Sequence, residues 1–217
     1  MALKIHSLKK KGETVTFDLE GASMAFANAL RRVMIAEIPI LAVEWAEFHE
    51  NSSALYDEIV AHRLGLIPLK FEADQFRFTA DCTCEGEGCP QCQVVFAVEK
   101  TGPCIVSSGD MKSSNKAVKP ASPDFPIVEL LRGQSIKFEA VARLGIGQQH
   151  AKFQAANTVY AYEEEEGKTK SVAKEKNAVF HFTVESISGL DPETIVAKAA
   201  DVLEAKAQNF KRRLLLR

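Results

Sequence analysis

Hydrophobic and polar residues alternate along the first twenty positions of the chain. Apolar side chains stand at Leu3 and Ile5 and again at Val15, Phe17 and Leu19, and the second set is interleaved with threonine and acidic residues. A period of two residues is typical of a strand with one solvated face. Because only KKKGE separates the two segments, the pattern predicts a β-hairpin.

The apolar period becomes helical after this hairpin. Ser23 is a typical N-cap, and Pro39 marks the end of the helix. At 100° per residue, one face carries four apolar side chains, which are Phe26, Leu30, Val33 and Met34. The opposite face carries Asn28, Arg31, Arg32 and Ile35. We therefore expect a helix over residues 23–37 with one face for a core and one for a partner.

The middle of the chain is mostly β-like. PILAVEWAEFHEN predicts a strand, and NSSALYDEIVAHRLGLIPL predicts a short helix that ends at Pro68. From Phe71 to about Leu144 strand patterns are interrupted by turns; SIKFEAVARLG alternates cleanly, whereas MKSSNKAVKPASPDFP has the composition of a loop. The charged segment YEEEEGKTKSVAKEK predicts a solvated linker or hairpin tip.

The last forty residues return to the pattern of the first. AVFHFTVES alternates as a strand, and Asp191 followed by Pro192 is a strong start signal for a long helix. Apolar residues then recur at spacings of four and three: Val196, Ala200, Leu203, Ala207, Phe210 and Leu214. A helix of about 25 residues is roughly 38 Å long, more than a small domain needs for its own core. We expect part of this seam to contact another chain.

These patterns predict an α+β protein in which one domain interrupts another. Antiparallel strands and amphipathic helices make up a split domain of residues 1–44 and 178–217. Residues 45–177 form an inserted β-rich domain that carries a metal loop at residues 82–92.

Composition restricts the classes of function. Lys and Arg number 27 and Asp and Glu number 29, so the net charge of −2 supplies no overall field that attracts nucleic acid. No apolar run has the length of a signal core or a membrane span, and we expect a cytoplasmic protein with no membrane partner. An odd count of five cysteines argues against a secreted disulfide framework.

Four of the cysteines form the cluster DCTCEGEGCPQC, which contains Cys82, Cys84, Cys89 and Cys92. Four thiolates match tetrahedral Zn²⁺, and a site filled by protein ligands is structural because no position remains for a substrate water. The flanking FRFTA and QVVFAV have the pattern of two strands joined by this loop. An iron–sulfur cluster is the alternative cofactor, and four unliganded thiols are the remaining interpretation.

Motifs for catalysis are absent from the sequence. It contains no HExxH, GxSxG or GxxxxGK[ST] segment. His62 and His150 are expected to be structural residues rather than acid–base groups. The sequence therefore favours binding or assembly over chemistry.

Three segments carry a resemblance to a known family. FDLEGASMAFANALRRVMIAEIPILAVE resembles the signature around the first helix of α-type RNA polymerase subunits, with NALRR at residues 28–32. NSSALYDEIVAHRLGLIPL and LGIGQQHAKFQAANTVYAY resemble the family of the archaeal D-type and eukaryotic third-largest polymerase subunits. The resemblance implies a dimerisation domain split between the termini, with an inserted β-rich domain whose cysteine loop holds zinc in several members.

The resemblance also implies a function within DNA-directed RNA polymerase, a nucleotidyltransferase complex. Family members have no active site of their own; they pair with a small α-like partner, the L-type subunit in archaea, and the pair is the platform for the largest and second-largest subunits. The apolar faces named above on helix 23–37 and the C-terminal helix would form the dimer contact. Asn28, Arg31 and Arg32 would contact the second-largest subunit. DNA would be reached only through the complex.

Two departures from the family qualify this expectation. Many archaeal relatives carry an additional ferredoxin-like domain with iron–sulfur ligands, whereas only the acidic segment 160–176 stands at that place here. We therefore assign the metal to the 82–92 loop. The separate DNA-binding domain of the bacterial α-type protein has no counterpart before Arg217, so direct promoter reading is not expected.

Two other classes of function compete with the scaffold. A free-standing zinc module that binds nucleic acid would need basic residues beside the cysteines, but the loop has Asp81, Glu85 and Glu87, which repel phosphate. A redox protein would give a brown preparation that absorbs near 400 nm, whereas a zinc protein would be colourless.

Overall fold

The structure is a computed structural model that describes residues 3–72, 74–162 and 178–215. The chain divides into two compact units. The first, here the terminal unit, combines Met1–Ile38 with Gln154–Arg217, and the second, the central unit, is Pro39–Phe153. Most of the predicted acidic hairpin, residues 163–176, lies outside the described residues.

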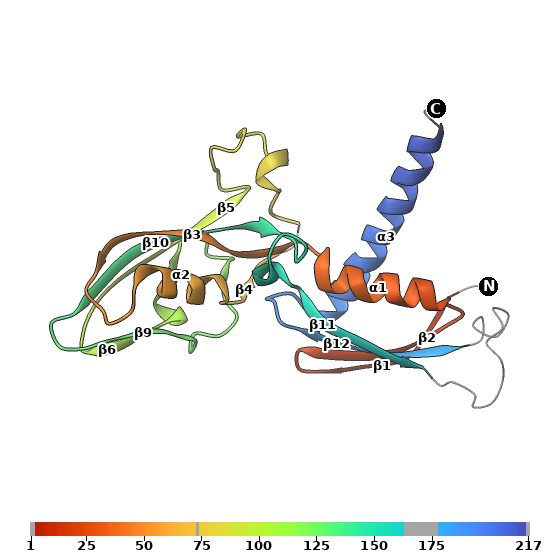
Figure 1. Cartoon of the computed structure of the whole chain (residues 1–217), viewed down its shortest axis with the longest axis horizontal. Helices are drawn as coiled ribbons and strands as arrows, with labels where there is room; N and C mark the ends of the chain where they lie inside the picture. Colours follow the sequence, from red (N-terminus) through yellow and green to blue (C-terminus); the bar gives the residue numbers. More distant parts are fainter. Residues whose placement is uncertain (1–2, 73, 163–177, 216–217) are drawn as a thin grey trace. The chain divides into compact units, whose positions relative to one another are not determined.

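The terminal unit is built on a four-stranded antiparallel sheet with the order β1-β2-β12-β11. Its strands are β1 (Lys4–Lys11), β2 (Thr14–Glu20), β11 (Ala156–Tyr162) and β12 (Val179–Ser186). The predicted hairpin is confirmed as β1 and β2. The centre of the sheet joins segments from the two ends of the chain, because β2 pairs with β12 along its whole length (Figure 1).

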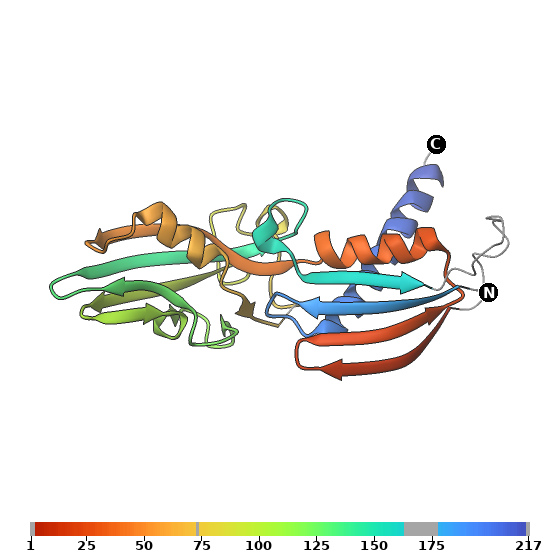
Figure 2. The same ribbon diagram turned by 60° about the horizontal axis from the view of Figure 1, so that its bottom comes forward.

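Two helices cover this sheet. α1 (Met24–Ala36) begins where predicted, since the Ser23 side chain accepts a hydrogen bond from the Phe26 amide at 3.2 Å. α3 (Pro192–Leu215) begins after Asp191, whose Oδ1 accepts from the Glu193 amide at 3.0 Å. α1 packs against β11 and α3, and Figure 2 shows it running over β11.

The core of the terminal unit lies between this sheet and the helices. The alternating residues of β2 and β12 point into it, which are Val15, Phe17, Leu19, Phe180, Phe182 and Val184. Phe17 and Phe182 are directly cross-strand, and their rings stack with centroids 5.0 Å apart. Burying these side chains is the largest favourable contribution to the stability of the unit.

The central unit contains a second antiparallel sheet with the order β3-β10-β5-β7. Its strands are β3 (Ile40–Asn51), β5 (Gln93–Thr101), β7 (Lys112–Ser113) and β10 (Ser135–Gly145). Two further strand pairs are β4 (Leu69–Lys70) with β8 (Lys119–Pro120) and β6 (Cys104–Ser107) with β9 (Pro126–Leu130). The predicted short helix is α2 (Asp57–Gly65), which packs on β3 and β9. The short 3₁₀ helices are Thr79–Asp81, Ser108–Asp110 and Ala151–Phe153.

The structure places the division between the units differently from the predicted boundaries at 45 and 177. The central unit begins at Pro39 and ends at Phe153. β11 follows that end and belongs to the terminal sheet, because it pairs with β12 from Ala156 to Tyr162. Alternation along β11 indicates a strand but does not indicate which sheet the strand joins, so the sequence pattern missed this assignment.

The segment before the cysteines is also different from the prediction. The strand predicted for FRFTA is not formed, and this segment is irregular up to the 3₁₀ helix Thr79–Asp81. The Arg77 amide donates to the Gln91 carbonyl at 2.9 Å, which brings the two ends of the cysteine loop together without a ladder. QVVFAV, after the cysteines, is confirmed as the start of β5.

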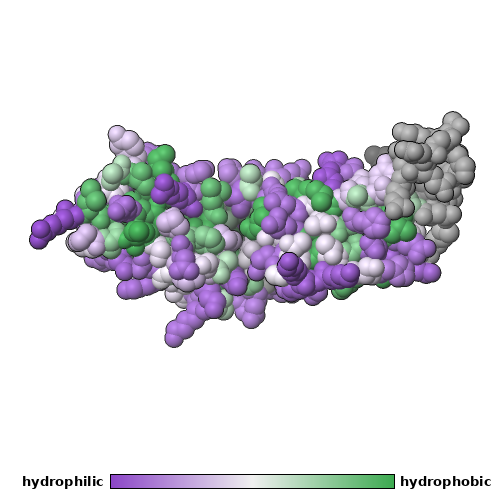
Figure 3. Space-filling view, turned by 90° about the horizontal axis from the view of Figure 1, so that it is seen from below, coloured by the Kyte–Doolittle hydropathy of each residue, from purple (hydrophilic) through white to green (hydrophobic). Residues whose placement is uncertain are grey.

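Hydrophobic side chains also remain exposed in both units. In the central unit they include Tyr56, Ile59 and Leu66 around α2 and Ile105 on β6. On the face shown in Figure 3, hydrophobic patches are separated by hydrophilic residues. Among the described helices, none is long and apolar enough to cross a membrane.

One ion pair of the central unit predicts an acid-dependent loss of stability. Lys100 Nζ lies 2.6 Å from Asp110 Oδ1, and the Ser107 amide donates to Oδ2 at 3.0 Å. The hydrogen bond from Lys100, followed by that from Ser107, lowers the pKa of Asp110. A carboxyl group whose folded pKa is lowered stabilises the fold above its unfolded pKa of about 3.9, and this contribution is lost as the pH falls through the folded pKa.

We therefore expect Asp110→Asn to lower the free energy of unfolding by about 1 kcal/mol at pH 7 and to flatten its pH dependence below about pH 4. Urea unfolding between pH 2 and 7, roughly the range over which an aspartate titrates, measures both. Asp124→Asn is the control, since that side chain is exposed in a neighbouring loop. Equal pH profiles for Asp110→Asn and the parent chain would contradict the assignment.

Candidate metal centre and contact surfaces

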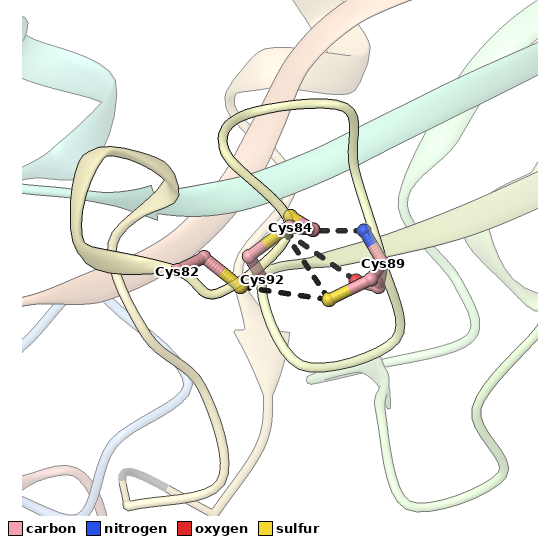
Figure 4. A group of neighbouring side chains, drawn as sticks. All are labelled: Cys82, Cys84, Cys89 and Cys92. Carbon is pink, nitrogen blue, oxygen red and sulfur yellow. Dashed lines mark hydrogen bonds between the residues drawn. The ribbon is translucent and has the colours of Figure 1, made fainter.

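The four cysteines of the 82–92 loop converge on one point. Their Sγ atoms all lie within 4.8 Å of one another. Cys82 and Cys92 are buried, while Cys84 and Cys89 are half-buried. Figure 4 shows the four side chains pointing toward one another from successive turns of the loop. The sequence prediction that these residues come together is thus confirmed.

The distances between the sulfur atoms fit a tetrahedral ion. Sγ of Cys82 and Cys89 are 3.5 Å apart, those of Cys84 and Cys92 are 3.6 Å apart, and those of Cys89 and Cys92 are 3.9 Å apart. Four sulfurs at about 2.3 Å from one central ion lie about 3.8 Å from each other. A disulfide would bring two of them to about 2.05 Å, and all four are free thiols. The loop can therefore hold one metal ion with four protein ligands.

Backbone conformation turns N–H groups toward the sulfurs. Glu85, Gly86 and Gly88 have φ values of 53°, 93° and 92°, a region that glycine adopts without strain. Hydrogen bonding from the backbone of Gly86 and Gly88 lowers the pKa of Cys84. The Cys89 amide donates to Cys92 Sγ at 3.3 Å. These hydrogen bonds favour the thiolate form, which is the form that binds metals.

The thiols have different affinities for protons. The hydrogen bond from the Gly86 amide, with help from the Cys82 thiol, lowers the pKa of Cys84 to about 6. Burial raises the pKa of Cys92 to about 12. A bound cation would have to displace the Cys92 proton, so metal binding at neutral pH releases protons and weakens as the pH falls.

The predicted large-subunit contact residues form one polar patch on α1. Arg31 Nη2 donates to Asn28 Oδ1 at 3.1 Å, and both residues are half-buried. Arg32 is exposed. The hydrogen bond orients one guanidinium, while the other extends into solvent.

The predicted dimer residues of α1 lie mostly in the core of their own unit. Leu30, Val33 and Met34 are 6%, 3% and 0% exposed, and Phe26 is half-buried. Ala27, which the prediction omitted, is fully buried with them. Their burial leaves almost no surface for a partner, which corrects the expectation that this face forms the dimer contact. Apolar periodicity identifies a buried face, but it does not distinguish a sheet of the same chain from another chain.

The predicted dimer residues of α3, unlike most of those of α1, are half-buried or exposed. Ile195 and Ala199 make the internal contact, and the predicted Val196 and Leu203 are half-buried beside them. Every described residue from 204 to 215 is exposed; this segment is called distal α3 below. Ala200, which precedes distal α3 along the chain, is also exposed. The exposed residues of distal α3 include Ala207, Phe210 and Leu214. Near its start, Lys206 Nζ lies 2.5 Å from Glu37. The terminal unit thus leaves the end of its longest helix uncovered.

The structure combines a split sheet covered by two helices, an inserted β unit and a four-cysteine loop. Comparison with known protein families identifies the class of protein that has this combination. The model of the family described as RNA polymerase Rpb3/RpoA insert domain matches residues 33–160. Together with the relatives described next, this match shows that the chain belongs to the Rpo3 family of DNA-directed RNA polymerase subunits, the archaeal D-type family. The resemblance found in the sequence is confirmed.

Several relatives carry the name DNA-directed RNA polymerase subunit Rpo3. The protein from Pyrococcus horikoshii is 49% identical over 164 residues, covering 74% of this chain and 60% of the relative. The protein from Archaeoglobus fulgidus is 46% identical over 154 residues, covering 71% and 58%. The chain thus spans about 60% of the length of these two relatives.

A third relative aligns over nearly its full length. The protein of the same name from Methanothermobacter thermautotrophicus is 33% identical over 254 residues, covering 93% of this chain and 96% of the relative. The aligned part of this chain is about 202 residues, which is 93% of 217. About 52 of the 254 aligned positions therefore have no counterpart in this chain. Relatives are named as polymerase subunits, which fits a non-catalytic subunit of that complex.

Proposed function

We propose that this chain is a non-catalytic assembly platform of DNA-directed RNA polymerase. It pairs with a small α-like partner, the L-type subunit, and the pair docks the largest and second-largest subunits for transcription. The observation that carries this proposal is distal α3, an uncovered helix end with apolar side chains. Membership of the Rpo3 family supports the polymerase context.

Distal α3 has the properties of a docking helix. Phe210, Leu214 and Leu215 are 68%, 58% and 77% exposed. Phe210 and Leu214 are one turn apart and share a face. A twelve-residue helical end is about 18 Å long and is only marginally stable in water without packing. Its occupant is therefore an apolar surface of another polymerase chain, and the L-type subunit is the occupant that we propose.

The polar patch of α1 is proposed as the contact with the second-largest subunit. Arg32 is free to reach an acidic surface, and Arg31 is held in place by Asn28. A guanidinium that is already oriented loses less entropy when it binds a carboxylate. The core residues of α1 support this patch from beneath rather than contact the partner.

The metal is proposed to be Zn²⁺ in a structural role. All four positions of a tetrahedral ion are filled by Cys82, Cys84, Cys89 and Cys92, which leaves no open position for a reacting water. Bound zinc would cross-link the loop and stabilise the folded state. An iron–sulfur cluster is the second candidate because it takes the same donors.

Charge placed on distal α3 is expected to prevent pairing. Phe210→Asp removes the largest exposed apolar side chain of distal α3 and places a carboxylate at the contact, which we expect to weaken binding of the small α-like partner by about thirtyfold or more. Co-expression followed by size-exclusion chromatography with in-line mass measurement gives the fraction paired.

Asn209→Asp is the matched control, because it adds the same charge on the neighbouring position of the same turn. We expect it to pair like the parent chain. Unchanged pairing by Phe210→Asp, or equal loss by both variants, would contradict the proposed contact. A homodimer in the absence of the small α-like partner would contradict the choice of partner.

A further inference from the structure

The side chain of Gln93 connects the metal loop to the sheet of the central unit. Gln93 directly follows Cys92 and begins β5. Its carboxamide lies against the α carbon of Gly88, so closely that a Cβ atom added to Gly88 would be 2.5 Å from Oε1 and 2.6 Å from Cδ. No residue other than glycine fits at position 88 while Gln93 keeps this position.

Gly88 directly precedes the metal ligand Cys89. Its φ of 92° belongs to the left-handed region, and the amide of Cys89 donates to Cys92 Sγ at 3.3 Å. A shift of the Gly88 backbone would move both the Cys89 ligand and this N–H donor. The carboxamide of Gln93 therefore acts on Cys89 through one residue.

Arg143 holds the other side of the carboxamide. It is the cross-strand partner of Gln93 in the β5–β10 ladder, and its Nη2 donates to Gln93 Oε1 at 3.1 Å. Among the described residues, its Nε is buried and has no hydrogen-bond partner. A buried N–H without a partner is unfavourable. An apolar residue would avoid this cost, so the observed residue suggests that its contact with Gln93 matters.

We propose that Gln93 and Arg143 are positioning residues of the metal centre. Arg143 orients the carboxamide, the carboxamide fixes Gly88, and Gly88 keeps the adjacent Cys89 and its N–H in place against Cys92. None of these groups binds the ion. The inference rests on the proposed metal function and adds to it the residues that keep the loop in its binding conformation.

The test is the dissociation constant for Zn²⁺ of the full chain, measured by competition with a chromogenic chelator. Gln93→Ala empties the space over Gly88, and we expect zinc to bind about tenfold more weakly, at the lower end of the effect of residues behind metal ligands. Gln91→Ala is the matched control, because it removes the same side-chain type from an exposed position of the same loop. We expect its affinity to be that of the parent chain.

A double-mutant cycle separates positioning from general packing. Gln93→Met keeps the length of the side chain but replaces the amide oxygen with a weakly accepting thioether, and Arg143→Met removes the donor. If the two residues act through their shared bond, the double variant should lose no more affinity than the weaker-binding single variant. Losses that simply multiply would overturn the proposed chain of contacts.

Two further measurements exclude a trivial loss of folding. The thiolate-to-metal charge-transfer bands of the Co²⁺-loaded chain report the ligand geometry, and we expect them to shift in Gln93→Ala and not in Gln91→Ala. Amide hydrogen exchange should become faster at Cys89, whose amide donates to Cys92 Sγ, while the β10 amides stay protected. Faster exchange throughout β10 would instead show general unfolding and would overturn the positioning role.

The parent chain distinguishes failure of this inference from failure of the metal proposal. If it binds neither Zn²⁺ nor Co²⁺ at one ion per chain, the metal proposal itself is wrong. If it binds one ion and Gln93→Ala binds as tightly as Gln91→Ala, the metal proposal stands and the positioning role of Gln93 is wrong.

Discussion

Replacement of Cys92 by serine should abolish stoichiometric metal binding and destabilise the central unit. Cys92 is completely buried, and its Sγ lies 3.6 Å from that of Cys84 and 3.9 Å from that of Cys89. A serine hydroxyl is a shorter and harder ligand that does not ionise at neutral pH, so the fourth bond to the ion would be lost.

The size of the effect follows from mass action. With free zinc at about 1,000 times its dissociation constant, binding stabilises the folded state by about 4 kcal/mol, and Cys92→Ser should lose this contribution. Metal content per chain and thermal unfolding with and without a chelator measure the two effects. The chelator should lower the unfolding temperature of the parent chain and leave that of the variant unchanged.

The fifth cysteine supplies the control. Cys104 begins β6 and stands outside the cluster, so Cys104→Ser removes one thiol without touching the site. We expect it to keep one ion per chain. Equal metal loss by the two variants would show that cysteine removal in general, rather than this constellation, is responsible.

Truncation of Phe182 should destabilise the terminal unit by about 3–5 kcal/mol. Phe182 is 1% exposed, and its ring stacks on Phe17 at 5.0 Å and lies 5.3 Å from Tyr160. It thus joins three neighbouring strands on the helix-covered face. Phe182→Ala would leave a cavity in a sheet whose two halves come from distant parts of the chain, and urea unfolding gives the change in free energy.

Thr183 is the matched control, because it is the next residue of β12 and points to the exposed face. Thr183→Ala should change the free energy of unfolding by less than about 0.5 kcal/mol. If both variants lost stability equally, the assignment of the two sheet faces would be wrong.

Local patterns predicted the parts of the structure that depend on near neighbours. The capping positions Ser23 and Asp191 were found from sequence because a cap bonds to amides two or three residues away. The cysteine cluster was found for a similar reason, since its four ligands lie within eleven consecutive residues. A short loop brings such residues together whatever the rest of the chain does.

Features that depend on distant pairing were missed. The assignment of β11 to the terminal sheet depends on its pairing with β12, and the periodicity of a strand does not identify the strand beside it. Gln93 and Arg143 are fifty residues apart and meet only through the register of β5 and β10. The close approach of Gly88 and Gln93 was visible in the sequence only as a glycine in a turn. Long-range register, rather than local propensity, limited the sequence interpretation.

The pairing of β2 with β12 has a consequence for synthesis. Translation adds about 5–20 residues per second, so roughly 8–33 seconds pass between the end of β2 at Glu20 and the end of β12 at Ser186. During this interval the apolar side of the first hairpin lacks its central partner strand, and all residues of the central unit are made before β12 begins. The order of translation therefore lets the inserted unit fold first, and the nascent terminal unit is the part most exposed to aggregation or to capture by a chaperone.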